Sequence, residues 1–196
     1  GIKTGYNLFT FQAGQDTERY SSGIHAGGLA LLKWKNKFAL QTELLYSNEG
    51  TKICLDTHDS ALIAAGTEQI NLDYIAIPLM LKYYVTDGLN IEACPQVGLL
   101  VGGKTDYDIL TYIDSKMSTI TGAIDSKDWL KSITFGLNIG LEYEFKNRFF
   151  LQSRFHMGVT DIVKENKTIG VGGESIDLYY GQLKNKGFKF SAGYKF

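Results

Sequence analysis

Three histidines, His25, His58 and His156, are the residues of this chain best suited to acid–base chemistry. A serine hydrolase would set a reactive serine beside one of them, but no serine stands in a Gly-x-Ser-x-Gly context. His25 and His156 fall in segments that alternate as strands do, where a polar interior accommodates an imidazole. We therefore expect no catalytic residue and interpret the protein as not an enzyme.

His58 lies within residues 56–59 (Asp-Thr-His-Asp), whose side chains are of the types that bind metal ions. Their spacing matches no zinc or calcium motif, so we expect a solvated loop and no metal. Cys54 and Cys94 lack the spacing of a CxxC pair. We expect Cys54 beside a long loop and Cys94 nearer a short turn, with no disulfide between them. No cofactor is expected.

Composition narrows the class of protein before any element is placed. The 196 residues carry 20 basic and 21 acidic side chains, a balance that argues against a nucleic-acid partner. Aromatic residues make up 13% of the chain and only 2 residues are proline, which argues against disorder. The length suits a single domain, residues 1–196. No apolar run is long enough for a membrane-spanning helix, and a strand-like pattern begins at Gly1, so we expect a processed, mature chain or a trimmed one.

The elements that position these residues follow a period-two pattern. Residues 37–47 place Phe38, Leu40 and Leu44 on one face, with Gln41 and Glu43 on the other. The same alternation predicts long strands over residues 74–84, 89–102, 133–145 and 188–196. Each strand runs for about ten residues or more, which is the length that a tilted strand needs to cross a bilayer.

The connections between the strands alternate in length. Tight turns are predicted at residues 35–37, 86–88 and 146–148, and long polar connections near residues 10–21, 49–68, 103–131 and 162–184. This arrangement predicts an all-β fold: an eight-stranded antiparallel up-and-down transmembrane β-barrel with short periplasmic turns and long extracellular loops. The mixed acidic and apolar stretch 103–131 is either a partner surface or a strand extension above the membrane.

Aromatic side chains gather beside the predicted short turns. Amphipathic rings favour the membrane interface, so we interpret them as an aromatic girdle. The apolar face of each strand would then contact lipid, and the small and polar face would line the interior. The girdle is predicted to contain Trp34, Phe38, Tyr83, Tyr84, Phe145, Phe149, Phe150, Tyr194 and Phe196.

Charged residues fall on the face that should line the interior. Lys82 and Glu92 lie almost symmetrically about the turn at residues 86–88, so they should face each other across that hairpin. Such charges could form a binding site or an ion path. We favour a structural salt-bridge network, because eight strands leave no open pore and buried charges must be paired. On this basis Glu92→Ala should destabilise the barrel by leaving Lys82 unpaired. The predicted network comprises Glu43, Lys82, Glu92, Glu142, Glu144 and Arg154.

Several strand segments resemble one known family. Residues 40–47 (LQTELLYS), 74–84 (YIAIPLMLKYY), 92–98 (EACPQVG) and the closing 193–196 (GYKF) are similar to hallmarks of the PorT-like outer-membrane β-barrel family, common in Bacteroidetes. Two positions depart from the family pattern: Ala76 stands where a luminal Glu is usual, and Cys94 where a Gly is usual. The resemblance implies an eight-stranded barrel in the outer membrane, with Phe196 in a terminal signal that the barrel-assembly machinery reads. It implies little about activity.

From these observations we expect an integral, non-enzymatic protein of a Gram-negative cell outer membrane. It would act as an accessory or surface-interaction component of a larger envelope complex for export, uptake or assembly. The expected contacts are outer-membrane lipid, the barrel-assembly machinery during insertion and a possible protein partner at the long loops. Two alternatives remain open: a rim-located lipid-modifying enzyme, and a barrel that binds a small apolar ligand, which a tightly packed polar interior would exclude.

Overall fold

The computed structural model describes residues 1–12, 18–34, 37–59, 62–113, 116–164, 167–171, 174–178 and 183–196. Nearly all of the described chain is strand, apart from the short 3-10 helix η1 (Lys127–Trp129). No helix in these ranges is long and apolar enough to cross a membrane. The strands are β1 (Ile2–Gln12), β2 (Glu18–Trp34), β3 (Phe38–Asp59), β4 (Leu62–Tyr84), β5 (Leu89–Ile113), β6 (Lys116–Asp125), β7 (Ile133–Glu144), β8 (Phe149–Gly158), β9 (Lys167–Val171), β10 (Glu174–Leu178) and β11 (Lys184–Tyr194).

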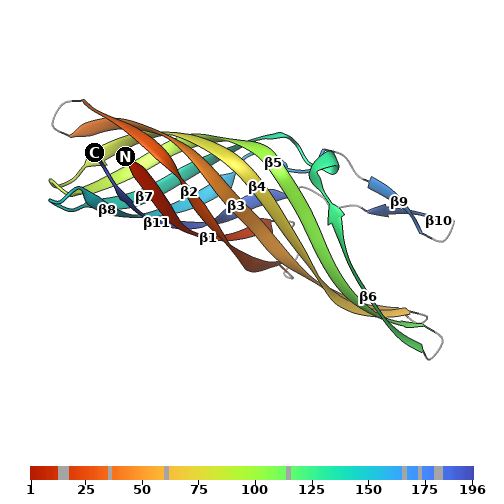
Figure 1. The fold of residues 1–196 in the computed structure, drawn as a ribbon. Helices are drawn as coiled ribbons and strands as arrows, with labels where there is room; N and C mark the ends of the chain where they lie inside the picture. The colour runs from red at the N-terminus through yellow and green to blue at the C-terminus, as the bar shows by residue number, and fades with distance from the viewer. Residues whose placement is uncertain are drawn as a thin grey trace.

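Eight of these strands form a closed antiparallel barrel (Figure 1). The order around the barrel is β1, β2, β3, β4, β5, β7, β8 and β11, and β11 pairs with β1 to close the ring. The alternating sequence pattern explains the closure, because each strand offers an apolar face to the outside and a small or polar face to the inside. The predicted fold class is therefore confirmed.

Three short turns lie at one end of the barrel, and both chain termini lie at the same end (Figure 1). In the β4–β5 turn, the Leu89 N–H donates to the Thr86 hydroxyl at 3.1 Å. In the β7–β8 turn, Arg148 adopts a positive φ of 69°. The Lys195 N–H donates to the carbonyl of Arg148 at 3.1 Å, which holds the C-terminus against this turn.

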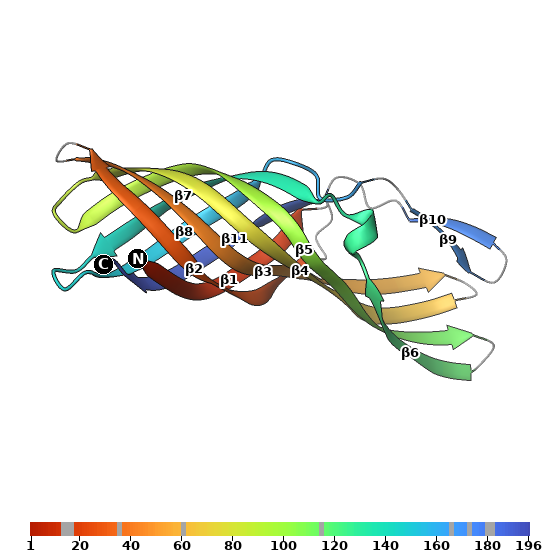
Figure 2. The ribbon, with the colours of Figure 1, turned by 45° about the horizontal axis from the view of Figure 1, so that its top comes forward.

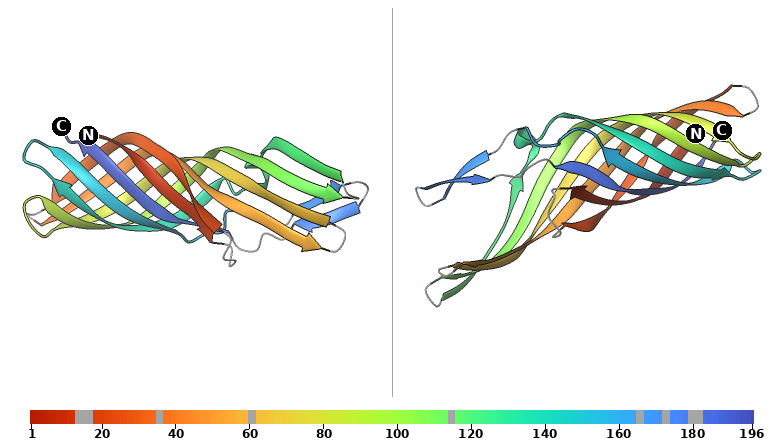
Figure 3. Two further views of the ribbon diagram at one scale, coloured as in Figure 1. Left: turned by 90° about the horizontal axis from the view of Figure 1, so that it is seen from below. Right: turned by 180° about the vertical axis from the view of Figure 1, so that it is seen from behind.

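Three strands are about twice as long as the barrel requires. β3, β4 and β5 contain 22, 23 and 25 residues, whereas β1, β7, β8 and β11 contain 10 to 12. Their outer parts pair with one another and with β6 to form a four-stranded sheet beyond the barrel, here called the projecting sheet (Figures 2 and 3). It consists of residues 52–59 of β3, 62–69 of β4, 104–113 of β5 and the whole of β6.

Two long connections expected as loops are thus largely strand. Residues 49–59 continue β3 and 62–68 lie in β4, while residues 103–113 and 116–125 form β5 and β6. The strand extension, one of the two interpretations of residues 103–131, is confirmed for residues 103–113 and 116–125, and a partner surface there stays a prediction. β3 is twice as long as β1, with 22 residues against 11. At a rise of about 3.3 Å per residue, the extra length adds about 35 Å.

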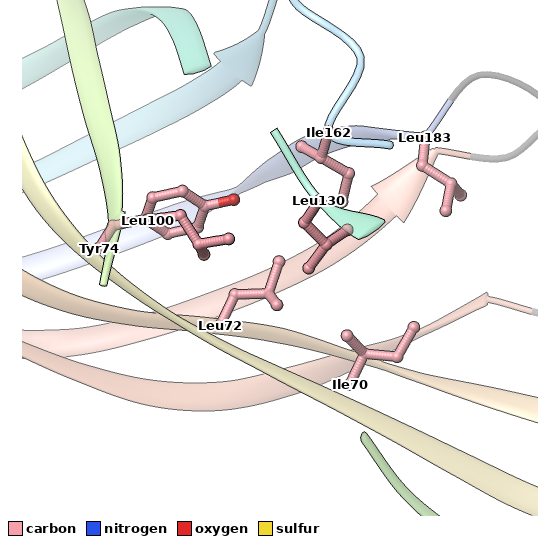
Figure 4. Close-up of a cluster of buried hydrophobic side chains, with 7 residues drawn as sticks. All are labelled: Ile70, Leu72, Tyr74, Leu100, Leu130, Ile162 and Leu183. Atoms are coloured by element: carbon pink, nitrogen blue, oxygen red, sulfur yellow. The ribbon is translucent and has the colours of Figure 1, made fainter. Parts of the chain in front are cut away.

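An apolar plug fills the barrel where the projecting sheet begins (Figure 4). Leu130, Ile162 and Leu183 come from the connections that follow β6, β8 and β10. Main-chain hydrogen bonds join these connections, with the Ile162 N–H donating to Leu183 and the Lys131 N–H donating to Ile162. The plug, here defined by its buried side chains, contains Ile70, Leu72, Tyr74, Leu100, Leu130, Ile162 and Leu183.

Candidate functional site

The lumen below the apolar plug is lined by buried polar and charged side chains. They project from the inward faces of all eight barrel strands, at alternate positions along each strand. Charges so far from water must be paired, because a lone buried charge costs several kcal/mol. The lumen is therefore the candidate functional site.

Arg154 on β8 is at the centre of these contacts. Its Nη1 and Nη2 donate to Oε2 and Oε1 of Glu43 at 2.8 and 2.7 Å, a bidentate arrangement. Its Nε donates to Glu92. Lys3 on β1 lies 2.9 Å from Glu43. Strands far apart in the sequence are thus joined across the barrel by one guanidinium.

A second set of ion pairs continues toward the short turns. Lys82 and Glu92 are register partners, and the Lys82 Nζ lies 3.2 Å from Glu92 and 2.5 Å from Glu142. Lys195 lies 2.7 Å from both Glu142 and Glu144. The structure thus brings all six predicted charges into one connected group.

Three members of this group were missed by the sequence reasoning: Lys3, Gln152 and Lys195. The Gln152 amide donates to Glu92 at 3.1 Å and to Glu142 at 3.0 Å, and it accepts from Lys3 at 2.8 Å. Alternation along the first and last strands could have placed Lys3 and Lys195 on the inward face. The complete group, called the lower luminal network, has four cations and four carboxylates and consists of Lys3, Glu43, Lys82, Glu92, Glu142, Glu144, Gln152, Arg154 and Lys195.

A further polar layer lies between this network and the apolar plug. Lys189 pairs with Glu49 at 2.9 Å. His25 Nδ1 donates to the side-chain oxygen Oδ1 of Asn7 at 2.7 Å, and the Ser191 hydroxyl donates to His25 Nε2 at 2.7 Å. His156 Nδ1 donates to Asn138 at 2.9 Å. Both histidines are held by side-chain hydrogen bonds in the polar interior that the sequence predicted for them.

The family of the chain follows from comparison with known proteins. A family model described as an outer membrane protein beta-barrel domain matches residues 1–164. The chain belongs to this family. It is accordingly an integral protein of the outer membrane, with its short turns in the periplasm and the projecting sheet outside the cell.

Solved structures similar to this outer-membrane barrel include the attachment invasion locus protein Ail of Yersinia pestis, at 10% identity and a TM-score of 0.43, covering 100% of this chain and 96% of Ail. Neisserial surface protein A is 9% identical with a TM-score of 0.46 and the same coverages. CarO of Acinetobacter baumannii is 12% identical with a TM-score of 0.39, covering 97% of each chain. A search of curated proteins finds no match. The family assignment rests on the family model.

The lipid-facing surface of the outer-membrane barrel carries rings beside the short turns. Trp34 is 72% exposed, and the rings of Phe38 and Tyr83 lie 5.2 Å apart. Phe149 contacts Tyr194 at 5.0 Å, and Tyr194 contacts Phe196 at 6.0 Å. Phe145 is also exposed and contacts Tyr143, which the sequence reasoning did not include, at 4.9 Å.

Two residues predicted for the girdle point into the barrel instead. Tyr84 is 8% exposed and Phe150 is 1% exposed. Lys33 lies 5.3 Å from the Tyr84 ring centre, and Lys195 lies 4.9 Å from that of Phe150. Tyr84 directly follows the girdle residue Tyr83, and Phe150 directly follows Phe149. Successive side chains of a strand point to opposite faces, so only one member of each pair can face lipid. Including both members of each pair in the girdle was wrong.

Other residues singled out by the sequence fall partly beyond what the structure describes. The side chains of Cys54, Asp56 and His58 lie outside the described residues, so the expectation that this segment binds no metal stays a prediction. Among described side chains, no group of three His, Cys, Asp or Glu is placed to hold a metal ion. Cys94 is buried and free, and it accepts a hydrogen bond from Asn138 at 3.3 Å.

Proposed function

We propose that this outer-membrane barrel is a non-enzymatic accessory or surface-interaction component of a larger envelope complex, and that it belongs to the PorT-like branch of barrels. The segments at residues 74–84 and 92–98 that resemble this branch pair with each other in the β4–β5 hairpin. The observation that carries the proposed role is the contrast between a lumen filled by side chains and a sheet that projects far beyond it.

The filled lumen favours a scaffold over a conduit or a ligand container. The lower luminal network joins β1, β3, β4, β5, β7, β8 and the C-terminal Lys195 by paired charges, and the apolar plug lies above it. A small apolar ligand would have to displace these ion pairs, at a cost of several kcal/mol for each charge left unpaired. The projecting sheet, by contrast, presents exposed residues such as Asp108, Thr119 and Thr121 outside the cell.

Extraction from the native host in mild detergent, followed by sizing and mass spectrometry, tests this proposal. We expect a second protein to co-purify in a fixed ratio with the chain. An unrelated barrel extracted from the same membranes serves as the control for nonspecific association. Recovery of the chain alone in its detergent micelle, in repeated preparations, would contradict the accessory role.

A lipid-directed hydrolase is the second candidate, and one observation favours it. Ser191, His25 and Asn7 form a serine–histidine–amide chain with both hydrogen bonds at 2.7 Å, the arrangement that activates a nucleophile. However, Ser191 is only 6% exposed and faces the lumen between the lower luminal network and the apolar plug. An ester would have to cross one of these layers to reach Ser191. The hydrogen bonds among these three side chains therefore fit a structural role in the lumen better than a catalytic one.

A fluorophosphonate reagent distinguishes the two roles, because it labels activated serines. We expect no labelling of the folded barrel at Ser191. Labelling that disappears in a His25→Ala variant would overturn the non-enzymatic proposal and establish the hydrolase in its place.

A further inference from the structure

The projecting sheet has two lateral edges, one formed by β3 and the other by β6. Among the described residues, β2 pairs with β3 as far as the register pair of Glu18 and Ile53, so residues 54–59 of β3 form one edge. β6 forms the other, and among the described strands it pairs with β5 alone (Figures 2 and 3). All ten residues of β6 therefore have a free side.

The two edges also differ in charge. Beyond Ile53, the β3 edge contains Asp56, His58 and Asp59. Between Lys116 and Asp125, the β6 edge reads MSTITGAI, with no charge and no proline. Natural proteins ordinarily protect a free edge with charges, prolines or bulges, because an unprotected edge pairs with other chains. β6 lacks such protection over eight consecutive residues that include four β-branched side chains.

The direction of the main-chain groups on β6 follows from one hydrogen bond. The Ser126 N–H, directly after β6, donates to the Gly103 carbonyl on β5 at 3.1 Å. Alternate residues of an antiparallel strand direct their N–H and C=O groups to opposite sides. The N–H groups of Thr119, Thr121 and Ala123 therefore point away from β5, toward the free edge.

We propose that the free edge of β6 receives an extended segment of a partner polypeptide as an additional strand. This inference rests on the proposed surface-interaction function and names its docking site. Main-chain hydrogen bonds supply the binding energy in such a complex, and alternate side chains of the added strand supply the selectivity. The edge is long enough to pair with a strand of ordinary length.

One face of the sheet determines the charge of the added strand. Asp108 and Asp106 are register partners of Thr121 and Ala123, so all four lie on this face. Asp106 is paired with Lys104 at 2.7 Å, which leaves Asp108 as the exposed carboxylate nearest the middle of β6. Because the intervening side chains are small, a long basic side chain on the added strand can reach across them to Asp108.

The opposite face of β6 is apolar around Gly122 and Ile124. Ile124 is 44% exposed there, and the Tyr107 ring covers Gly122, where an added Cβ would lie 2.2 Å from the Tyr107 hydroxyl. Apolar or β-branched side chains suit this surface. The partner segment therefore alternates basic residues with apolar ones.

A synthetic peptide tests the site on the full chain embedded in lipid nanodiscs. The probe is an end-blocked peptide of the length of β6 that alternates lysine with valine. We expect saturable binding and slower amide exchange confined to Lys116–Asp125. The same peptide with every amide N-methylated, which has no N–H group left to donate to β6, should not bind. A glutamate–valine peptide should bind at least about tenfold more weakly, because it meets Asp108 with like charge.

A protein variant tests the same edge from the other side. Thr119→Pro with Thr121→Pro removes two N–H groups that face the free edge and leaves the hydrogen bonds to β5 in place. We expect peptide binding to be lost while the barrel remains folded by gel mobility. Equal binding of the N-methylated peptide, protection at residues 54–59 instead, or amides of Thr119, Thr121 and Ala123 already protected without peptide would each overturn the proposal.

The outcome is separable from that of the proposed function. A partner that co-purifies equally with the wild-type chain and with the double proline variant would leave the accessory role standing and remove β6 as the docking site. Absence of any partner from both would remove the accessory role itself.

Discussion

Arg154 gives up its hydration in the lumen, and two carboxylates from different strands replace it. Glu43 accepts hydrogen bonds from both terminal nitrogens of Arg154, and Glu92 accepts one from its Nε. Lys82 is differently placed, because Glu92 and Glu142 both lie within ion-pair distance of it. The expectation that Glu92→Ala would leave Lys82 unpaired is therefore wrong: Glu142 remains.

These contacts predict an order of stability among variants. Arg154→Ala removes three charge-assisted hydrogen bonds and leaves Glu43 with Lys3 alone and Glu92 with Lys82 alone, so we expect a loss of about 3–5 kcal/mol in the free energy of unfolding. Glu92→Ala should cost less, because Arg154 keeps Glu43 and Lys82 keeps Glu142. Urea unfolding in lipid vesicles, followed by tryptophan fluorescence, measures both. Midpoints that are equal, or in the reverse order, would count against the network as described.

A glycine beside an inward histidine supplies a second prediction at this scale. An added Cβ at Gly136 would lie 2.4 Å from Cε1 of His156, so the glycine makes room for the ring. Gly136→Ala should therefore destabilise the barrel by about 1–3 kcal/mol, and a His156→Ala background should reduce that loss. Gly28→Ala is the matched control, because the nearest atom to its added Cβ is 3.9 Å away. A loss that the His156→Ala background leaves unchanged would show that the ring is not the cause.

At the scale of elements, period-two alternation and turn spacing predicted the strands and their inward faces. The hairpin register also predicted the meeting of Lys82 and Glu92, since both flank one short turn. Arg154 and Glu43 are 111 residues apart, and their meeting depends on how the closed barrel staggers its strands, which local sequence does not encode. The sequence left the outer part of β5 open between a loop and a strand extension, because Asp106 and Asp108 make one face polar.

The apolar plug yields a prediction for β4 as an element. Leu72 is fully buried in the plug, whereas Leu79 on the same strand faces lipid. Leu72→Ala should cost about 2–5 kcal/mol, because it removes buried contacts and leaves a cavity. Leu79→Ala exchanges one lipid contact for another and should cost much less. Thermal loss of the folded gel mobility compares the two, and similar midpoints would show that the plug contributes little to stability.

At the scale of the whole molecule, the ends of the lumen are occupied by different chemistry. Ions that approach from the periplasm meet the lower luminal network, in which four cations are paired with four carboxylates. Ions that approach from outside the cell meet the apolar plug. Passage would require separating ion pairs that are several kcal/mol more stable together than apart. Planar bilayers containing the purified chain should therefore show no current above the lipid background.

A matched variant makes that expectation decisive. Arg154→Ala combined with Glu92→Ala removes both members of a pair, while Glu43 keeps Lys3, Lys82 keeps Glu142 and the apolar plug above is unchanged. This variant should also be silent, because the plug alone excludes hydrated ions. If it conducts and the wild type does not, the ion pairs are the seal and the plug is permeable. Steady unitary currents from the wild type would show that the lumen is a channel, and the protein would then be a conduit rather than a scaffold for its projecting sheet.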